Sequence, residues 1–520
     1  MNFSKKHNHL LFYILSLVVI VLAIYQSIIL RWICDDAYIS FVYAKNLING
    51  NGLVFNVNEY VEGFTNFLWT VFIAFGIQFF GSPQWFSVIL GIFFYVSLLV
   101  LFFTEENKMV GGRFLPLLTI HLAMFYHLWV FSTSGLETMC FTFFLSLGLL
   151  KWEKKSKFAL FFFCLASFLR PEGILFFSIL TIELIKCKNF RILFLPVICL
   201  LCFFLFRVLY FGDLLPNTYF AKANRGSYGL QGLNYLFYLL KAYPLYLFVI
   251  SFAFIRFFRE IKDDRLVFFR IFSIMMYIVY VLYIGGDFMA LRFWIPILPI
   301  LSYYAVKQIY EWDGNCSFSS NDNILFFRFY KSNQILFHLL FLLASIVYID
   351  PLVVDGKRTS DWKGIGEERE FYKSELMGSE GYDQGALQNF NIAFFGAQAH
   401  FVYFLEPKYA FESESGLTDR QFARKKIEGR GRIGHESNLE ISDLRERSVE
   451  LLFANKFPYL DLPHITYNWR YFPIKIYILV YEPNKVKSLC HRANWNCENL
   501  FSYLQNQNFS VEAKHSFYPQ

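Results

Sequence analysis

The sequence has little charge for its length. Charged residues make up 17% of its 520 residues and hydrophobic residues 56%, and the mean hydropathy is +0.38. A soluble domain with so few charges would expose a surface that aggregates, so the composition excludes an ordinary soluble protein. So many hydrophobic side chains are instead expected to contact a lipid bilayer.

The patterns of several enzyme classes are missing. The chain has no Walker loop, no His/Cys spacing of a zinc site and no nucleophile elbow. Gly429 to Gly434 matches GxGxxG formally, but no predicted strand precedes it and no apolar helix follows, which excludes a nucleotide site. The net charge of +7 is modest and lies mainly in one class of loop. This pattern indicates membrane orientation and no nucleic-acid partner.

The cysteines are scattered and form no metal-binding pattern. Most lie in apolar stretches, where a buried thiol is the ordinary interpretation. Cys490 and Cys497 differ, because they lie in a polar C-terminal tail. A disulfide between them is one of two open alternatives, and it requires that the tail face an oxidising compartment.

Long apolar runs are abundant. A membrane-spanning helix needs roughly 20 apolar residues, and on this criterion we expect about eleven spans. The first run is expected to be a transmembrane helix, since it is too long for the apolar core of a cleaved signal. The expected spans are Leu10–Leu30, Gln84–Phe103, Phe114–Phe131, Glu137–Leu150, Lys157–Leu169, Gly173–Ile185, Phe190–Phe211, Pro244–Ile255, Leu266–Ile284, Phe293–Ile309 and Ile335–Ile349.

The apolar run Phe67–Phe80 decides the orientation. If it crosses the membrane, every later loop changes side. If it lies along the outer surface as a juxtamembrane helix, most basic residues of the short loops fall on one side, as the positive-inside rule requires. We therefore expect a multi-pass protein of the inner (plasma) membrane, with a cytoplasmic N-terminus and an extracytoplasmic C-terminal domain.

The composition changes sharply after Asp350. The following residues are mixed, charged and glycine-containing, with strand-like runs at Asn391–Phe395 and Ile474–Val480. We therefore expect a polytopic α-helical membrane domain over residues 1–350, with an outer loop and juxtamembrane helices at 31–83. Residues 351–520 are expected to form a soluble extracytoplasmic α+β domain.

In this orientation, charged residues at the helix ends gather at the outer face. Charges within a bilayer are costly unless they are paired, hydrated or functional. A convergence of carboxylates and guanidinium groups therefore indicates an extracytoplasmic active site. The residues concerned are Asp35, Asp36, Glu62, Glu137, Arg170, Asp213, Lys222, Asp287 and Arg292.

The adjacent acids Asp35 and Asp36 are the main candidates for catalysis. Transfer of a group to a hydroxyl needs a carboxylate that accepts the hydroxyl proton, or a divalent metal that steadies the leaving group. Adjacent acids at a membrane boundary suit either role, because burial and mutual repulsion raise the pKa of one of them. The alternative interpretation is an acidic pair that is simply solvated at a helix end.

Blocks of residues along most of the chain resemble the membrane glycosyltransferases of the GT-C superfold, in particular the terminal arabinofuranosyltransferases of the AftB and LphB type. Each block is weak alone, but their order along the chain makes the set specific. The blocks are Cys34–Ser40, Asn49–Asn56, Val61–Asn66, Thr133–Thr138, Leu169–Gly173, Tyr210–Tyr219, Gly285–Met289 with Arg292-Phe293, Gly416–Arg420 and Arg430–Glu436.

The resemblance implies a lipid-linked (polyprenyl-phosphate) sugar donor, a cell-envelope glycan acceptor and an essential acid, Asp35 or Asp36. It predicts a GT-C glycosyltransferase that transfers an arabinofuranose-like sugar. One departure is the stretch Glu412-Ser413-Glu414, where family members often carry an Asp. A transporter or flippase, and a non-catalytic envelope-assembly protein, are the alternatives.

The remaining candidates are divided by the chemistry of their side chains. Arg170, Lys222 and Arg292 are expected to bind the donor phosphate, the arginines through a planar fork and the lysine as a point charge. The alternative for the arginines is snorkelling to the headgroups. The expected substrate contacts are Glu62, Asn66, Glu137, Asp213, Asn217, Asp287, His435 and Glu436.

Overall fold

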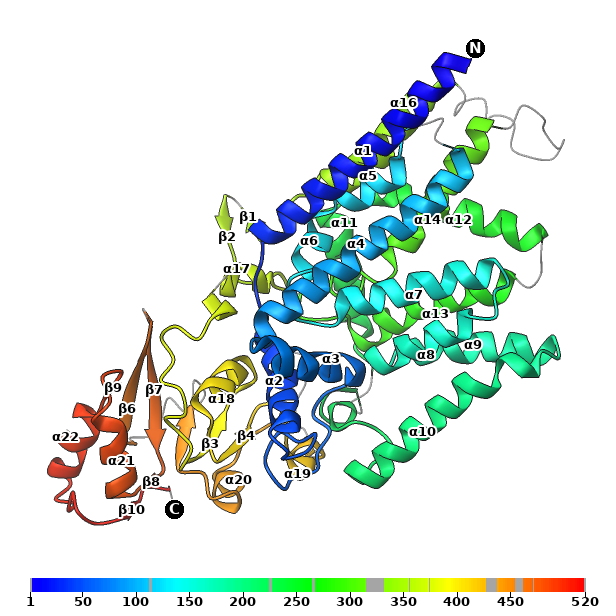
Figure 1. Cartoon of the computed structure of the whole chain (residues 1–520). Helices are drawn as coiled ribbons and strands as arrows, with labels where there is room; N and C mark the ends of the chain where they lie inside the picture. Colours follow the sequence, from blue (N-terminus) through cyan, green and yellow to red (C-terminus); the bar gives the residue numbers. More distant parts are fainter. Residues whose placement is uncertain are drawn as a thin grey trace. The chain divides into compact units, whose positions relative to one another are not determined.

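The computed structural model describes residues 2–111, 115–223, 227–263, 267–314, 332–354, 356–373, 375–426, 437–453, 462–470 and 472–518. Figure 1 shows helices over most of the chain and strands toward its C-terminal end. The chain divides into two compact units, which we describe separately. The helical unit comprises Met1–Ile33, Trp85–Cys202 and Gly226–Ser374, and the sheet unit comprises Cys34–Gln84, Phe203–Arg225 and Glu375–Gln520. The expected division into a membrane domain up to residue 350 and a soluble domain after it stays a prediction.

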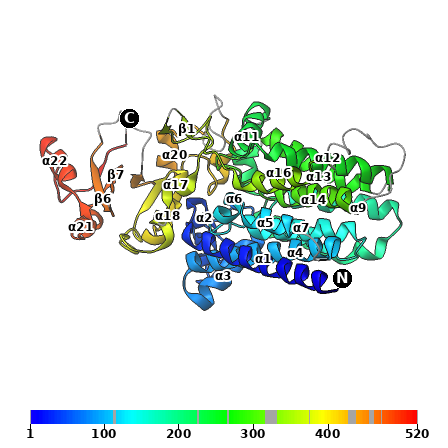
Figure 2. The ribbon, with the colours of Figure 1, turned by 90° about the horizontal axis from the view of Figure 1, so that it is seen from above.

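The helical unit consists mainly of apolar helices. Helix α7 packs against α8, α8 against α9, and α12 against α14, while α1 lies beside α5 (Figures 1 and 2). Its helices, of which α4 and α10 also contribute residues to the sheet unit, are α1 (Asn2–Ile29), α4 (Pro83–Val110), α5 (Leu117–Ala123), α6 (Tyr126–Phe131), α7 (Thr138–Glu153), α8 (Ala159–Leu169), α9 (Gly173–Lys186), η1 (Phe190–Ile192), α10 (Phe194–Phe211), α11 (Gly229–Ala242), α12 (Tyr246–Asp263), α13 (Val267–Ile284), α14 (Leu298–Gly314), α16 (Gln334–Ile346) and α17 (Glu368–Tyr372). Strands β1 (Val353–Val354) and β2 (Lys357–Arg358) form a small antiparallel pair.

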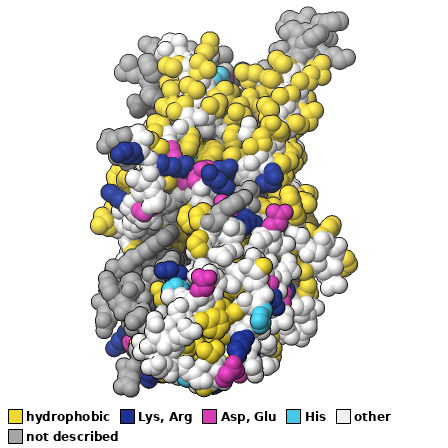
Figure 3. Space-filling view, turned by 90° about the vertical axis from the view of Figure 1, so that its left-hand side faces the viewer, with side chains coloured by type: hydrophobic (Ala, Val, Ile, Leu, Met, Phe, Trp, Pro, Cys, Tyr) yellow, Lys and Arg dark blue, Asp and Glu magenta, His cyan; other side chains and the backbone are white. Residues whose placement is uncertain are grey.

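Four helices in the described part of the chain are long and apolar enough to cross a membrane. They are His9–Ile29, Pro83–Val110, Phe194–Phe211 and Val267–Ile284. Helices α11 and α12 pass the same test together, although they bend by 111° at the break between them. Large hydrophobic side chains are exposed along these helices, and hydrophobic side chains cover much of the helical surface in Figure 3. The chain is therefore a multi-pass helical membrane protein, while the expected number of about eleven crossings stays a prediction.

The expected span Phe114–Phe131 is wrong as a single helix. It consists of α5 and α6, which are separated at Met124 and Phe125. Side chains satisfy the carbonyl groups freed by this break: Tyr95 donates its hydroxyl to the Leu122 carbonyl at 2.9 Å, and Trp129 donates its indole N–H to that of Ala123 at 2.7 Å. Because these groups are paired within the protein, the helix can break without exposing polar backbone to lipid.

The sheet unit also contains helices from the N-terminal part of the chain. Helix α2 (Asp35–Ile48) packs against α3 (Phe67–Phe80) and α18 (Ala399–Leu405). With 14 residues, α3 is shorter than the roughly 20 needed to span a bilayer. Its position along the outer surface stays a prediction.

A six-stranded mixed sheet forms the core of this unit, in the order β4-β3-β5-β7-β6-β9. Strand β3 pairs in parallel with β4 and β5, and the remaining pairs are antiparallel. Buried Ala393, Phe411 and Leu452 pack together in its core. The strands of the unit are β3 (Asn391–Phe394), β4 (Tyr409–Glu412), β5 (Leu451–Phe453), β6 (His464–Trp469), β7 (Phe472–Ile478), β8 (Val480–Tyr481), β9 (Trp495–Asn496) and β10 (His515–Ser516). The sheet confirms the expected α+β character of the C-terminal region.

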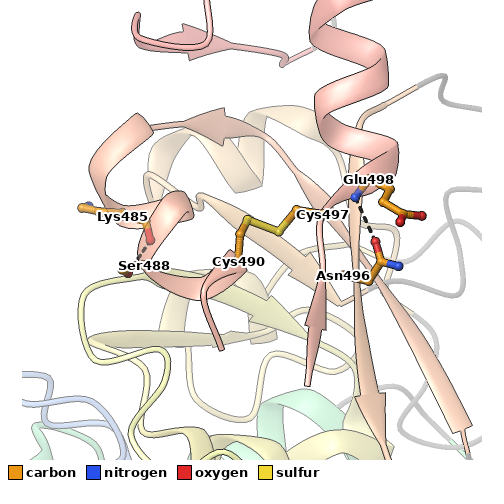
Figure 4. The surroundings of a disulfide bond; sticks show 6 residues. All are labelled: Lys485, Ser488, Cys490, Asn496, Cys497 and Glu498. Atoms are coloured by element: carbon orange, nitrogen blue, oxygen red, sulfur yellow. Dashed lines mark hydrogen bonds between the residues drawn. A yellow bond between two sulfur atoms is a disulfide. The ribbon is translucent and has the colours of Figure 1, made fainter. Parts of the chain in front are cut away.

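The short helices of the sheet unit cover and connect its strands, and α22 contacts β6. They are η2 (Tyr219–Ala223), η3 (Glu375–Met377), η4 (Gly396–Gln398), α19 (Arg420–Ala423), α20 (Ile441–Glu446), α21 (Pro483–Cys490) and α22 (Glu498–Asn506). A disulfide joins Cys490, the last residue of α21, to Cys497, which directly precedes α22 (Figure 4). Of the two alternatives for these cysteines, free thiols or a disulfide, the structure contains the disulfide.

Candidate active site

Asp35 is the first residue of α2, and its carboxylate is buried. Oδ1 accepts a hydrogen bond from the backbone N–H of His400 at 3.0 Å and lies 2.6 Å from the ring Nδ1 of the same residue. Oδ2 accepts from the backbone N–H of Ala399 at 3.1 Å. These N–H groups belong to the first turn of α18, where helix donors have no intrahelical partner. The carboxylate is therefore held in one orientation by a helix end.

Asp36 follows in the first turn of α2 and is half-buried. Both acids lie at the N-terminus of α2, where the helix dipole favours negative charge. The two neighbours thus differ in access: Asp35 is enclosed and fixed, whereas Asp36 is partly open to its surroundings.

His400 is one of three neighbouring aromatic side chains that each carry a buried polar atom. The atoms are Nε2 of His400, the hydroxyl of Tyr382 and Nε1 of Trp469, and none has a hydrogen-bond partner among the described residues. The rings lie 5.3 to 5.8 Å apart between centroids. Because buried polar atoms are nearly always hydrogen-bonded, these three atoms are unusual polar groups within the aromatic surroundings of His400.

Glu62 forms a buried ion pair with Arg207, whose Nε lies 2.8 Å from Glu62 Oε2. Burial raises the pKa of Glu62 from 4.5 to about 7, and the opposing effect of Arg207 only reduces this shift. The pKa of Glu62 is thus raised by burial even though a cation lies beside it.

Asn217 joins two of the blocks that carried the family resemblance. Its side-chain amide donates to the carbonyls of Gly416 and Leu417 at 2.8 and 3.0 Å. Its backbone N–H donates to the Glu62 carbonyl at 2.9 Å. These contacts position the chain, and the substrate contact expected of Asn217 stays a prediction.

Asn66 and Asp213 also have protein partners. Asn66 is buried, and its Oδ1 accepts from the hydroxyls of Ser40 and Thr70, each at 3.1 Å. Asp213 pairs with Arg420 and Arg424, each at 3.0 Å. The structure therefore supports a positioning role for both residues, and their predicted substrate contacts stay predictions.

Arg170, in the helical unit, is almost completely enclosed by two acids. Its Nη1 donates to Glu137 at 2.9 Å, and its Nε and Nη2 form a fork on Glu172 at 3.3 and 2.9 Å. Its guanidinium carbon also lies 4.5 Å from the Phe293 ring centroid. These bonds occupy the planar fork that a phosphate would use.

Arg292 belongs to the same charge cluster, and its bonds to Asp287 and Glu137 are longer. Its Nη1 lies 3.3 Å from Asp287 Oδ2, and its Nη2 lies 3.4 Å from Glu137 Oε1. Bonds of this length are longer than the 2.7–2.9 Å typical of charge-assisted pairs. Of the two arginines, Arg292 is therefore the one whose partners a phosphate oxygen replaces more easily.

For three expected site residues the structure gives no side-chain position. The side chain of Lys222 is not described, and His435 and Glu436 lie outside the described residues. Among the residues that are described, no group of three or more His, Cys, Asp or Glu side chains is placed to hold a metal ion.

Four residues of the site were not singled out from the sequence: His400, its aromatic neighbours Tyr382 and Trp469, and Arg207. His400 lies 365 positions from Asp35 in an aromatic run, and no local pattern distinguishes it. Arg207 is a charge within an apolar run that ends at Phe211. A charge inside a candidate span is a signal of a paired or functional residue, and it could have identified Arg207.

The sequence is similar to a curated transferase over part of its length. It is 29% identical over 249 residues to the terminal beta-(1->2)-arabinofuranosyltransferase of Mycobacterium tuberculosis (strain ATCC 25618 / H37Rv). The match covers 42% of this chain and 39% of that protein, so it spans about two fifths of the relative's length. No family model matches the chain. The predicted resemblance to the arabinofuranosyltransferases is thus confirmed over these residues.

The fold is similar to that of a solved membrane protein. The crystal structure of ArnT from Cupriavidus metallidurans bound to undecaprenyl phosphate matches with a TM-score of 0.51 and 12% sequence identity. The match covers 89% of this chain and 97% of that one. The predicted GT-C-like fold, with a sheet-containing C-terminal region, is therefore confirmed.

Proposed function

We propose that this chain, which has a GT-C-like fold and resembles an arabinofuranosyltransferase, is a membrane glycosyltransferase. It transfers an arabinofuranose-like sugar from a polyprenyl-phosphate donor to an extracytoplasmic cell-envelope glycan. The sequence match supports the sugar class, and the fold shared with a protein crystallised with undecaprenyl phosphate supports the lipid-linked donor.

The observation that carries the proposal is the anchored carboxylate of Asp35, with Asp36 beside it in the first turn of α2. In the transfer, an acceptor hydroxyl oxygen forms a bond to the anomeric carbon while the bond to the phosphate oxygen breaks. The electron pair leaves with the phosphate, and the hydroxyl proton passes to a carboxylate. Asp35 accepts three hydrogen bonds, and a carboxylate has about four acceptor positions. We assign proton acceptance to Asp35, with Asp36 as its partner.

The donor phosphate is assigned to Arg292, with Arg170 as a positioning residue. The long bonds of Arg292 to Asp287 and Glu137 allow exchange for phosphate oxygens. The shorter bonds of Arg170 to Glu137 and Glu172 keep these acids in place. Lys222 is retained as a third phosphate contact because it follows the block Tyr210–Tyr219 closely in the sequence.

The extracytoplasmic placement of the site has two supports. The disulfide between Cys490 and Cys497 is typical of an oxidising compartment. The excess of basic residues in one set of short loops favours a cytoplasmic N-terminus. Nucleotide sugars are absent outside the cytoplasm, which favours a lipid-linked donor.

The test measures transfer from a labelled polyprenyl-phosphate arabinose to an envelope glycan in membranes. We expect Asp35→Asn to reduce kcat by about 100-fold or more, since general-base catalysis contributes 10²–10⁴-fold. Asp361→Asn, at an exposed acid of the helical unit, serves as the matched control. Undiminished transfer by folded Asp35→Asn protein would reject the assignment of the base. Absence of transfer by the wild-type protein would reject the proposed function.

A further inference from the structure

The sheet unit contains a surface pocket with a cavity volume of about 480 Å³. Three segments form it: Glu59–Val61, the end of α10 at Leu209–Gly212, and Thr418–Gln421. Helix α10 is one of the helices long and apolar enough to cross a membrane. The pocket therefore lies where a candidate span ends, and no role assigned above uses it.

Two tyrosines form an aromatic wall of this pocket. The rings of Tyr60 and Tyr210 meet edge to face, 5.0 Å apart and at 87°. Tyr210 is fixed, because its hydroxyl accepts from the Leu53 N–H at 2.7 Å and its ring stacks on Phe206. Tyr60 is 47% exposed. An exposed ring on a rigid support suits the apolar face of a sugar, and it loses little conformational entropy when the sugar binds.

Arg420 holds the walls of the pocket together. It donates hydrogen bonds to the carbonyls of Phe211 and Tyr60, which lie on different segments. Its Nε pairs with Asp213 at 3.0 Å. The guanidinium is thus used to fix the pocket's shape, and a carboxylate already balances its charge.

The remaining polar groups favour a neutral ligand. Glu59 and Asp419 line the pocket, and an anion would face the carboxylate of Glu59, whereas Arg447 balances the charge of Asp419. Asp419 is bound by Arg447 at 2.6 and 2.9 Å, whereas Glu59 is half-buried with its pKa raised by burial. The exposed amide of Gln421 can both donate and accept. Carboxylate and amide groups suit sugar hydroxyls, and like-charge repulsion disfavours a phosphate.

We propose that this pocket binds the neutral glycan acceptor, with a sugar ring on Tyr60 and its hydroxyls on Glu59 and Gln421. This rests on the proposed transfer reaction and deepens it, because it assigns the acceptor a site within the sheet unit. The volume is in the usual range for ligand pockets, about 300–1,000 Å³.

The experiment separates the two substrates by their kinetics. Tyr60→Ala is expected to raise the KM for the glycan acceptor about tenfold, as loss of an aromatic anchor does, and to leave the KM for the lipid-linked donor unchanged. Tyr60→Phe keeps the ring and should remain close to wild type. Phe472→Ala removes an exposed ring of β7 outside the pocket and is the control. A raised donor KM, or no change in either KM, would overturn the inference.

Direct binding keeps the test independent of turnover. Saturation-transfer NMR with a short neutral arabinan oligosaccharide is measured on the full-length wild-type and Tyr60→Ala proteins in nanodiscs. A signal that the substitution weakens supports the pocket, even if no transfer is detected and the proposed function fails. Equal signals from the two proteins would reject the pocket.

Discussion

Arg170 in the helical unit and Asp35 in the sheet unit are both buried charges, but their partners differ in kind. Arg170 is surrounded by the side chains of Glu137 and Glu172. Asp35 is bound by two backbone N–H groups and one histidine ring. A side chain can change rotamer or protonation, whereas the N–H groups of a folded helix end can do neither.

This difference suits the roles that we assign to the two regions. A phosphate that enters or leaves requires cations whose partners can be exchanged, and a cluster of side chains permits such exchange. A base must keep its geometry through the reaction, and backbone donors provide this preorganisation without a cost at the moment of transfer. The comparison leads to three predictions, given from the largest expected effect to the smallest.

Arg170→Met should break the charge cluster of the helical unit. The substitution leaves Glu172 buried without the guanidinium of Arg170 and removes the shorter of the arginine bonds to Glu137. Loss of one partner of a buried pair costs about 3–5 kcal/mol. We expect a large fall in melting temperature and in the yield of folded protein. Arg292→Met should destabilise the protein less but raise the donor KM more. Equal loss of stability in both variants, measured by thermal unfolding in nanodiscs, would contradict the division of roles.

His400→Leu should weaken the fixation of Asp35 without removing its backbone donors. We expect kcat to fall about 10- to 100-fold, the range for the loss of a supporting contact that misplaces a catalytic group. His400→Asn provides a side-chain N–H close to the position of Nδ1, so it should recover part of the activity. The pH profile of kcat should shift in His400→Leu and return toward wild type in His400→Asn. Identical profiles in both variants would indicate a purely structural histidine.

Glu62→Gln should change the pH dependence of stability. The folded-state pKa of Glu62 is raised from 4.5 to about 7, so between these values the folded protein keeps a proton that the unfolded chain has released. The contribution of Glu62 to stability is therefore fully present below pH 4.5 and is lost as the pH rises through about 7. We expect the melting temperature of the wild type to fall, relative to the variant, over this interval. A constant difference between the two proteins would refute the raised pKa.

Much of the fold was predictable because it depends on local patterns. The spans expected at Leu10–Leu30 and Leu266–Ile284 overlap the long apolar helices His9–Ile29 and Val267–Ile284. The strand-like run at Asn391–Phe395 overlaps β3. The break within Phe114–Phe131 was missed because hydropathy does not show it. It depends on Tyr95 and on Trp129, whose side chains satisfy the freed carbonyls.

The candidate site was predictable only in part, for a similar reason. A carboxylate or guanidinium group at the end of an apolar run costs free energy unless it is paired, hydrated or functional. This local signal identified Asp35, Arg170 and Arg292 as candidates. It does not reveal a partner far along the chain, as His400 is for Asp35. Nor does it distinguish a side chain that binds substrate from one that holds the protein together, as the contacts of Asn217 illustrate.

The sequence by itself determined that this protein is an apolar, multi-pass helical chain with a mixed α+β region after it, and which ionisable residues lie at its helix ends. These properties follow from hydropathy and spacing, which act over a few turns of chain. The tertiary structure alone decided that two backbone N–H groups and His400 hold Asp35, that acids enclose Arg170, and that Tyr60 and Tyr210 line one pocket. Such pairings depend on which segments pack together, and packing joins residues that no local pattern relates.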